Sequence, residues 1–231
     1  MQLNADFSQR VAVHGAELAW TPSPIAGVER RMLDRIGGEV ARATSIVRYA
    51  PDSSFAAHTH GGGEEFFVLE GVFCDEHGDF PAGTYVRNPP TSRHTPGSKA
   101  GCTIFVKLWQ FALSDRTEVR IDTASKPFLG MPNRPDLAFM PLFKDAREEV
   151  RLERWATSSE IVRSLPGGAE LLVLAGGFAE GGDTFKPQSW LRLPAGATLR
   201  ATAAPTGCKL WVKLGHLLDI AQAPSAGAPE A

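Results

Sequence analysis

The sequence has few cysteines and no long hydrophobic run, and each shortage excludes a class of protein. Three cysteines occur among its 231 residues, and they form no C-x-x-C pair, which argues against a disulfide framework or a zinc-ribbon site. The longest apolar stretch, residues 171–175, is far shorter than the roughly 20 residues of a membrane-spanning helix. Asp6 and Arg10 stand where the apolar part of a secretion signal would lie. We therefore expect a cytoplasmic protein that does not enter a membrane.

An excess of charge of either sign is also missing. Lysine and arginine number 24 against 26 aspartates and glutamates, which gives a formal net charge of -2. No run of basic residues could follow a phosphate backbone, so we expect no direct contact with nucleic acid. Hydrophobic residues make up 43% and charged residues 22% of the chain, which is typical of a folded globular protein.

Patterns typical of helices are scarce, and short strand-like segments dominate. β-branched and aromatic residues, bounded by proline and glycine, fill residues 43–49, 65–69, 83–87 and 102–111. Only residues 24–35 and 144–159 have the length and charge for a local helix or an outer strand. The sequence therefore predicts an all-β fold, a barrel or a sandwich.

Three blocks of the first half return in the second half in the same order. Residues 46–51 match 161–166, residues 65–71 match 170–176, and residues 101–108 match 207–214. Three single residues between the blocks also align at a constant offset, namely Tyr85, Arg87 and Pro89 with Trp190, Arg192 and Pro194. Two copies at so long a period indicate two duplicated barrels in tandem.

These matches predict five segments along the chain. They are a lead at 1–17, a first barrel at 18–113, a linker at 114–140, a second barrel at 141–218 and a disordered tail at 219–231. In the alignment, about ten residues that include the strand of the first copy's paired histidines are missing from the second copy. We therefore expect the second barrel to be degenerate and to bind no metal.

One pattern in the first half predicts a metal site. His58, His60 and Glu64 follow the spacing His-x-His-x-x-x-Glu, and residues two apart on a strand share a face. The glycines at 61–63 allow a tight turn that brings Glu64 back from the next strand. His94 follows a proline-rich loop that could return it to the same interior. Imidazoles with one carboxylate suit zinc, iron, manganese, nickel or cobalt better than magnesium or calcium.

The same residues resemble the cupin superfamily. The spacing of His58, His60 and Glu64, with Gly71 seven residues later, is similar to the first cupin motif, and residues 83–89 followed by His94 resemble the second. The resemblance implies a double-stranded β-helix, the cupin or jelly-roll barrel, present here as a bicupin. Asp52, Thr91 and Ser98 depart from the usual motif residues, although none of the three positions supplies a metal ligand.

More narrowly, residues 18–113 resemble the cupin domain of the ChrR family of anti-sigma factors. In that family these histidines and the glutamate bind zinc, so the resemblance implies one zinc ion held by His58, His60, Glu64 and His94. It also implies a regulatory, stress-sensing role linked to a sigma factor of the extracytoplasmic-function type. We expect the separate helical domain with which ChrR proteins hold the sigma factor to be absent, so inhibition of the sigma factor does not carry over.

Two functions therefore stay open. The first is a non-enzymatic regulator whose zinc shell is filled by the four side chains, with a sigma factor or another regulatory protein as partner. The second is an Fe(II)-dependent dioxygenase that cleaves a dicarbonyl or phenolic ketone substrate at two open positions of the metal. Either function allows a small-molecule ligand in the first barrel and a homodimer of the chain.

The remaining candidates have simpler interpretations. His14, His77 and His216 have no partner at ligand spacing and are expected at the surface or as capping residues. Glu65 competes with Glu64 as a ligand, but its counterpart Glu170 in the second copy indicates a structural role. Core packing is expected of three aromatic residues that could also line a pocket and of one buried, inert thiol, namely Phe66, Phe105, Trp109 and Cys102.

Overall fold

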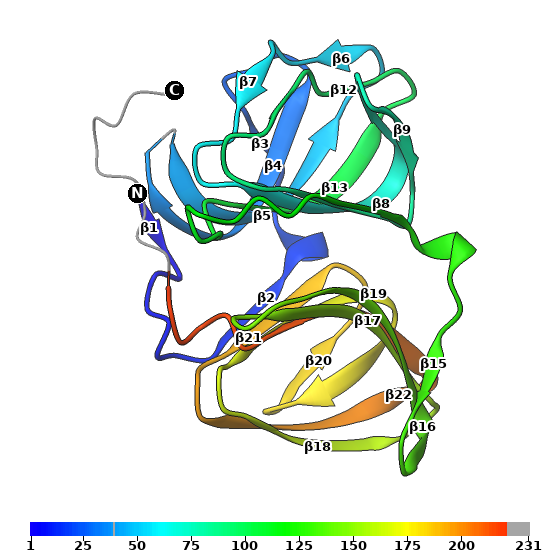
Figure 1. Ribbon diagram of the computed structural model, residues 1–231. Coiled ribbons are helices and arrows are strands. Elements are labelled where there is room, and N and C mark those ends of the chain that lie inside the picture. Colours follow the sequence, from blue (N-terminus) through cyan, green and yellow to red (C-terminus); the bar gives the residue numbers. More distant parts are fainter. Residues whose placement is uncertain (39, 221–231) are drawn as a thin grey trace. The chain divides into compact units, whose positions relative to one another are not determined.

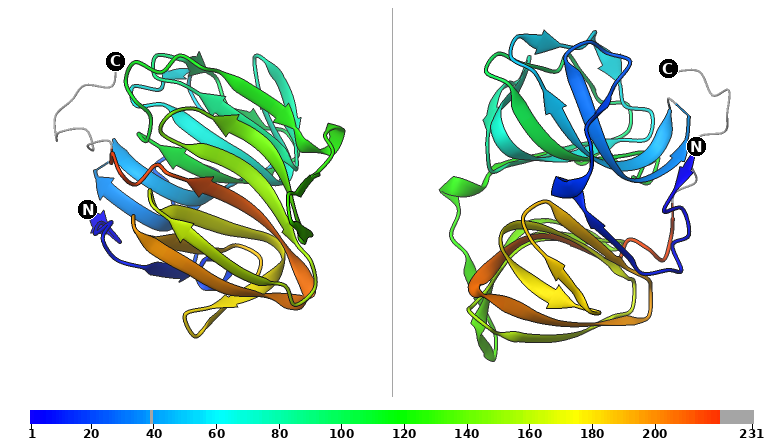
Figure 2. Two further views of the ribbon diagram at one scale, coloured as in Figure 1. Left: turned by 60° about the horizontal axis from the view of Figure 1, so that its bottom comes forward. Right: turned by 180° about the vertical axis from the view of Figure 1, so that it is seen from behind.

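The computed structural model describes residues 1–38 and 40–220, and it folds as two β units with almost no helix. Unit 1 comprises residues 1–5 and 19–125, and unit 2 comprises residues 6–18 and 126–220. Every strand pairing is antiparallel, and the sheet of each unit curves round on itself (Figures 1 and 2). The predicted all-β class is confirmed. Among the described residues, no helix has the length and apolar character to cross a membrane.

Unit 1 consists of thirteen strands and one short 3-10 helix. They are β1 (Gln2–Leu3), β3 (Thr21–Pro22), β4 (Val28–Gly37), β5 (Ala41–Tyr49), β6 (Ser53–Ser54), β7 (His58–Thr59), β8 (Glu64–Asp75), β9 (Gly78–Pro81), β10 (Thr84–Asn88), β11 (Arg93–His94), β12 (Gly97–Ser98), β13 (Cys102–Leu108), β14 (Val119–Asp122) and η2 (Thr123–Ser125). Its main sheet has the order β1-β4-β5-β13-β8-β10-β14, and β7 pairs with β11 in a separate ribbon.

Unit 2 consists of nine strands and one short 3-10 helix. They are β2 (Val11–His14), η1 (Gly15–Glu17), β15 (Leu129–Met131), β16 (Arg134–Lys144), β17 (Glu149–Trp155), β18 (Glu160–Leu165), β19 (Ala169–Glu180), β20 (Asp183–Phe185), β21 (Ser189–Leu193) and β22 (Ala197–Leu214). The sheet has the order β15-β16-β17-β22-β19-β21-β2.

The two units repeat one strand order, which agrees with the duplication seen in the sequence. The path β4-β5-β13-β8-β10-β14 of unit 1 corresponds to β16-β17-β22-β19-β21-β2 of unit 2. The register shift between Thr103 and Ile104 in β13 recurs in β22, where Lys209 pairs with Ala175 and Leu210 with Val173. The two units are therefore copies of one architecture down to the position of a β-bulge.

The repeated glycines are explained by a close backbone crossing. Gly71 and Gly176 have positive φ angles of 72° and 68°. A Cβ added to them would lie 2.1 Å from the carbonyl oxygen of Gly101 and 2.0 Å from that of Gly207, respectively. Only glycine fits such a position, because every other side chain would overlap the neighbouring strand.

One of the three sequence matches is wrong. Residues 46–51 and 161–166 look alike, but β5 pairs with β13, whereas β18 pairs with residues 197–202 of β22. The true counterpart of β5 is β17, in which Trp155 pairs with Cys208 as Tyr49 pairs with Cys102. The strand that we expected to be missing from the second copy is therefore present as β18, which pairs with the first part of β22 as β7 pairs with β11.

Segments of uncertain type in the sequence form strands. Residues 24–35 and 144–159 contain β4 and β17 rather than helices. Residues 114–140, for which we predicted a linker, contain β14, η2, β15 and the start of β16. Residues 1–17 contribute β1 to unit 1 and β2 to unit 2. Most of the tail predicted at 219–231 lies outside the described residues.

Alternation along the strands builds the core of unit 1 and positions the candidate site. Phe66 and Val68 of β8 face inward and pack with Ile104 and Val106 of β13. Glu64 begins β8 in phase with these apolar residues, so the period of two places its carboxylate on the inner face.

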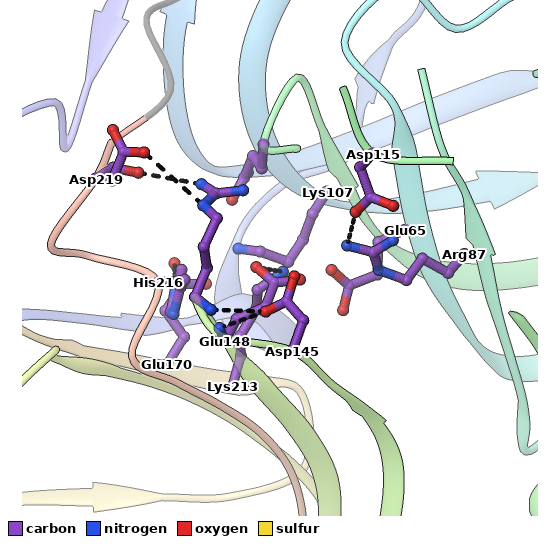
Figure 3. A network of polar contacts seen from close by, with 12 residues as sticks. Glu65, Arg87, Lys107, Asp115, Asp145, Glu148, Glu170, Lys213, His216 and Asp219 are labelled. Atoms are coloured by element: carbon purple, nitrogen blue, oxygen red, sulfur yellow. Dashed lines mark hydrogen bonds and ion pairs between the residues drawn. The ribbon is translucent and has the colours of Figure 1, made fainter. Parts of the chain in front are cut away.

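Polar residues of each unit pair within that unit, as Figure 3 shows. In unit 1, Arg87 Nη2 lies 2.7 Å from Asp115 Oδ2. In unit 2, Lys213 Nζ lies 3.0 Å from Glu148 Oε2. The repeat extends to a shared hydrogen bond, because Tyr85 donates to Glu65 at 3.1 Å and Trp190 donates to Glu170 at 3.2 Å. Glu65 and Glu170 thus have the same structural partner position in both units.

Candidate metal centre

Three histidines of unit 1 meet inside the barrel. His58 of β7 pairs directly with His94 of β11, and His60 follows two residues after His58. Each of the three imidazoles offers one nitrogen, and these nitrogens lie within 4.8 Å of one another. The ring centroids are 4.7–5.2 Å apart. The structure therefore gathers the three sequence-predicted histidines into one cluster.

Glu64 joins this cluster, and Glu65 does not. The Glu64 Oε2 atom lies 3.4 Å from His60 Nε2 and 3.5 Å from His94 Nε2. Glu65, one residue further along β8, points to the other face and accepts the hydrogen bond of Tyr85. All four residues of the predicted metal set thus lie together, and the competing carboxylate does not.

Two buried nitrogens of the cluster have no hydrogen bond. His60 Nε2 and His94 Nε2 are buried without a hydrogen-bond partner among the described residues. A buried polar atom without a partner costs about 1–3 kcal/mol. The arrangement becomes favourable when these nitrogens and the Glu64 carboxylate bind a common cation, and such a donor set suits zinc, iron or nickel. The residues therefore fit a divalent metal ion.

The outer nitrogens and the second carboxylate contacts hold the donors in place. His94 Nδ1 lies 3.1 Å from Asp75 Oδ2, and His58 Nδ1 lies 3.1 Å from the carbonyl oxygen of Ala56. An Nδ1–H that donates to an oxygen leaves the lone pair on Nε2, the atom that faces the cluster. The Asn88 side chain donates to Glu64 Oε2 at 3.1 Å.

Sequence reasoning missed both Asp75 and Asn88. Asn88 had a signal, because it follows Thr84 and Val86 on the inner side of a strand where an apolar residue would otherwise stand. Asp75 had none, because its contact with His94 depends on how the end of β8 folds over β11.

The site favours an ionised carboxylate beside neutral imidazoles. Burial opposes the charge on Glu64, but His60, His94 and the Asn88 hydrogen bond outweigh it and hold the pKa of Glu64 below its usual value. Burial lowers the pKa of His60, and the neighbouring His94 and His58 lower it further against the opposing effect of Glu64. Burial also opposes the charge on His94, but Asp75 and Glu64 outweigh burial and raise the pKa of His94.

The glycines at 61–63 are required by an aromatic ring as well as by the turn. A Cβ at Gly62 would lie 2.2 Å from Trp109 Cδ2, and one at Gly61 would lie 3.0 Å from Trp109 Cζ2. Gly63 has a φ of +77°, and its Cβ would meet Phe111 at 2.5 Å. The backbone between His60 and Glu64 therefore lies flat against Trp109, and this contact fixes both ligands.

A cavity of about 330 Å³ opens beside the cluster within unit 1. His58, His60 and Glu64 contribute to its wall, together with Trp109. Its other walls are mostly apolar, with Val47, Ile104, Val106 and Leu108 among them. The volume is at the lower end of the range for small-molecule sites. A metal ion held by the cluster would therefore face a space large enough for a small ligand.

The other candidates from the sequence lie elsewhere. His77 is exposed, while His14 Nδ1 lies 3.2 Å from Ser189 Oγ. The expectation for His216 is wrong, because its Nε2 lies 2.9 Å from Glu170 Oε1 in unit 2. Phe66 and Phe105 are buried. Burial raises the pKa of the Cys102 thiol to about 11, which makes it a poor nucleophile.

In unit 2 a buried cluster of ion pairs occupies the interior near β17 and β18. The Glu153 carboxylate lies 2.6 Å from Arg151 Nη2 and 2.8 Å from Arg163 Nη1, and it accepts a hydrogen bond from Trp155 Nε1 at 2.7 Å. Arg163 belongs to β18, the counterpart of the strand that carries His58. The second copy therefore has charged pairs where the first has metal ligands and a cavity.

The family comparison agrees with this geometry. Residues 8–112 match the family described as the ChrR Cupin-like domain. The match covers unit 1 through β13, including all four clustered residues. No curated protein matches the chain.

Solved structures with the same fold span both units. A protein from Nostoc punctiforme PCC 73102 described as a "putative dioxygenase" is 16% identical with a TM-score of 0.76, covering 96% of this chain and 88% of its own. The bacterial pirin YhhW from Escherichia coli, in complex with nickel(II), is 14% identical with a TM-score of 0.64, covering 90% and 99%. A variant of salicylate 1,2-dioxygenase from Pseudoaminobacter salicylatoxidans, in complex with gentisate, is 12% identical with a TM-score of 0.55, covering 76% and 69%. At these identities the likeness shows the cupin fold alone.

Proposed function

We propose that unit 1 binds one divalent metal ion through His58, His60, Glu64 and His94, and that a small molecule binds in the adjoining cavity. The observation that carries the proposal is the pair of buried Nε2 atoms, on His60 and His94, that converge on Glu64 without a hydrogen bond. Zinc is the metal that the ChrR resemblance favours, and iron, manganese and nickel are the alternatives. A bound ion of this kind would supply a Lewis acid that polarises a ligand oxygen.

The family match supports a sensing role for this site. Residues 8–112 match a domain named after ChrR, so we propose that occupancy of the cavity changes the stability or partner binding of unit 1. A sigma factor or another regulatory protein is the partner that this role implies. Control of an extracytoplasmic-function sigma factor, a homodimer and a cytoplasmic location all remain predictions.

A dioxygenase is the second candidate, and the cavity favours it. A purely structural metal site needs no space beside it, whereas a catalytic site keeps positions open for substrate and dioxygen. Two proteins of similar fold are described as dioxygenases, one of them as "putative". In this second proposal the four side chains hold Fe(II), and the cavity holds a dicarbonyl or phenolic ketone substrate.

Metal analysis of the full chain tests the shared part of both proposals. We expect about one metal ion per chain by inductively coupled plasma mass spectrometry, and loss of the ion in a His58→Ala, His94→Ala double variant. The matched control is His14→Ala with His77→Ala, which removes two histidines outside the cluster and should keep the ion. No metal in the native chain after loading with zinc or Fe(II) would overturn the proposal.

Oxygen uptake then separates the two functions. The Fe(II)-loaded chain is mixed with dicarbonyl and phenolic ketone compounds in an oxygen electrode. Uptake that the double variant lacks would support the dioxygenase and contradict a purely regulatory site. Absence of uptake together with stable zinc binding would support the sensing role.

A further inference from the structure

The charge of the cavity in unit 1 selects its ligand. Among the described residues that line it, Arg30 and Arg35 are the arginines and Glu64 is the carboxylate. With neutral imidazoles the formal charge of this wall is one positive, and a divalent ion would raise it to three. A small apolar cavity with such an excess attracts an anion, because its own carboxylate is already engaged with the histidines.

Arg30 has a free hydrogen-bond donor beside this space. It lies on β4, and its Nε is buried with no hydrogen-bond partner among the described residues. Its cross-strand partner on β5 is Val47, which also lines the cavity. The arginine on the outer side of β5, Arg48, instead pairs with the carboxylate of Glu29. Arg30 is therefore a guanidinium in the cavity wall whose Nε donor is left for a ligand.

Arg35 adds a second positive charge in line with the metal ligands. In the register of the sheet, Arg35 pairs with Ala43, Ala43 with Leu108, and Leu108 with Glu64. Three strand spacings separate Arg35 from Glu64, about 14 Å along the curved sheet, and the four strands lie side by side in Figure 1. Arg35 Nη2 donates to the carbonyl oxygen of Gly38, which holds the side chain.

Small side chains keep the space between the arginines and the cluster open. Ala41, Ala43 and Ser45 of β5 line this part of the cavity. At the corresponding positions of β17, unit 2 has Glu149 and Arg151, whose side chains form an ion pair. The cavity of unit 1 therefore depends on short residues at alternate positions of one strand.

We propose that the cavity binds a small organic acid, whose carboxylate pairs with Arg30 under the added charge of Arg35 and whose other end carries an oxygen donor toward His58, His60 and Glu64. The inference rests on the metal site proposed above and adds the chemical class of its ligand. The apolar wall of Val47, Ile104 and Val106 covers a short hydrocarbon body. Guanidinium groups recognise carboxylates by paired, charge-assisted hydrogen bonds.

Calorimetry on the full, zinc-loaded chain tests the proposal. The probes are propanoate, succinate, benzoate and 4-oxopentanoate, with the neutral 4-oxopentanamide as the matched compound without charge. We expect 4-oxopentanoate to bind, and the amide to bind about 10- to 100-fold more weakly, as the loss of a charged hydrogen bond predicts. Arg30→Gln should weaken binding of the acid by a similar factor, and Arg30→Lys should restore part of it.

The control variant is Arg48→Gln, which removes one positive charge from the outer side of the neighbouring strand and should bind the acid as the native chain does. Equal weakening in Arg30→Gln and Arg48→Gln would overturn the proposal, as would no binding of any of the four acids at millimolar concentration. Metal content separates the two proposals. An Arg30→Gln chain that keeps its zinc but loses the acid supports the inference. A native chain that binds zinc but no acid sinks the inference and leaves the metal site intact.

Discussion

At the scale of single residues, the metal ligands depend on neighbours that bind no metal. Asp75 orients His94 through Nδ1, and Asn88 orients Glu64 through Oε2. Such contacts fix the tautomer and the direction of a ligand, and they raise its basicity. The affinity of the site is therefore set partly by residues that the His-x-His spacing does not reveal.

Asp75→Asn should weaken metal binding without removing a ligand. The amide can still accept a hydrogen bond from His94 Nδ1, but the negative charge that raises the pKa of His94 is lost. We expect the affinity for zinc to fall about 10- to 100-fold, as measured by competition with a coloured chelator. Asp79→Asn changes an exposed carboxylate of β9 and serves as the control. Equal zinc affinity in Asp75→Asn and the native chain would show that Asp75 does not act on the site.

The sequence predicted the four clustered residues because their spacing is local, and it could not predict the residues around them. His58, His60 and Glu64 lie within seven positions, so the geometry of one hairpin relates them. Asp75 meets His94 across 19 positions of sequence, and Arg30 meets the cavity only through the register of β4 with β5. Contacts of this kind follow from strand pairing, which the residue pattern leaves open.

At the scale of elements, the second and third sequence matches identified true counterparts, and the first did not. The strands β8 and β13 recur as β19 and β22 with the same register shift, because a glycine crossing and an apolar inner face constrain both copies. The first match rested on an Ile-Val-Arg pattern that suits any half-buried strand. The pairing partners distinguish β17 from β18, and these partners lie 37–60 residues away along the chain.

The buried ion pairs near β17 should stabilise unit 2 in a pH-dependent way. Burial opposes the charge on Glu153, but Arg163 and Arg151 outweigh it and hold its pKa below the usual value. A carboxylate with a lowered folded-state pKa stabilises the fold fully above its unfolded pKa, about 4.3. This contribution is lost as the pH falls through the lower, folded-state pKa.

Glu153→Gln should therefore destabilise unit 2 at pH 7 and lose most of its effect in strong acid. Removing one partner of a buried pair costs about 3–5 kcal/mol, measured here as the free energy of unfolding in urea with tryptophan fluorescence as the signal. Glu160→Gln, at an exposed position of β18, is the control. A cost that stays constant from pH 7 to about pH 3 would contradict the assignment of the lowered pKa.

At the scale of the whole molecule, the two units keep one architecture but differ in what fills them. Unit 1 has a cluster of histidines beside a cavity, and unit 2 has a buried network of charged pairs. Ligand binding should therefore stabilise the units unequally, since an ion that binds only the folded state adds its binding free energy to that state.

Zinc should slow hydrogen exchange in unit 1 and leave unit 2 unchanged. At free zinc about 100 times the dissociation constant, the gain is about 2.7 kcal/mol. Amides of β7, β8 and β11 that exchange through unfolding of unit 1 should then exchange about 100-fold more slowly. Mass spectrometry of peptides from 58–75 and 149–165 compares the two units in one experiment. Slowing that persists in His58→Ala would place the effect of zinc outside the cluster.

The pairing of β2 with β21 bears on how the chain is synthesised. β2 (Val11–His14) leaves the ribosome among the first segments, but its partner at Ser189–Leu193 is made about 175 residues later. At about 5–20 residues per second, the delay is on the order of ten seconds or more. Unit 1 can complete its sheet in that interval, whereas unit 2 must wait to recover a strand made before the rest of it. Truncation between the units would consequently separate β2 from β21 and leave an open strand edge, which is a site for aggregation.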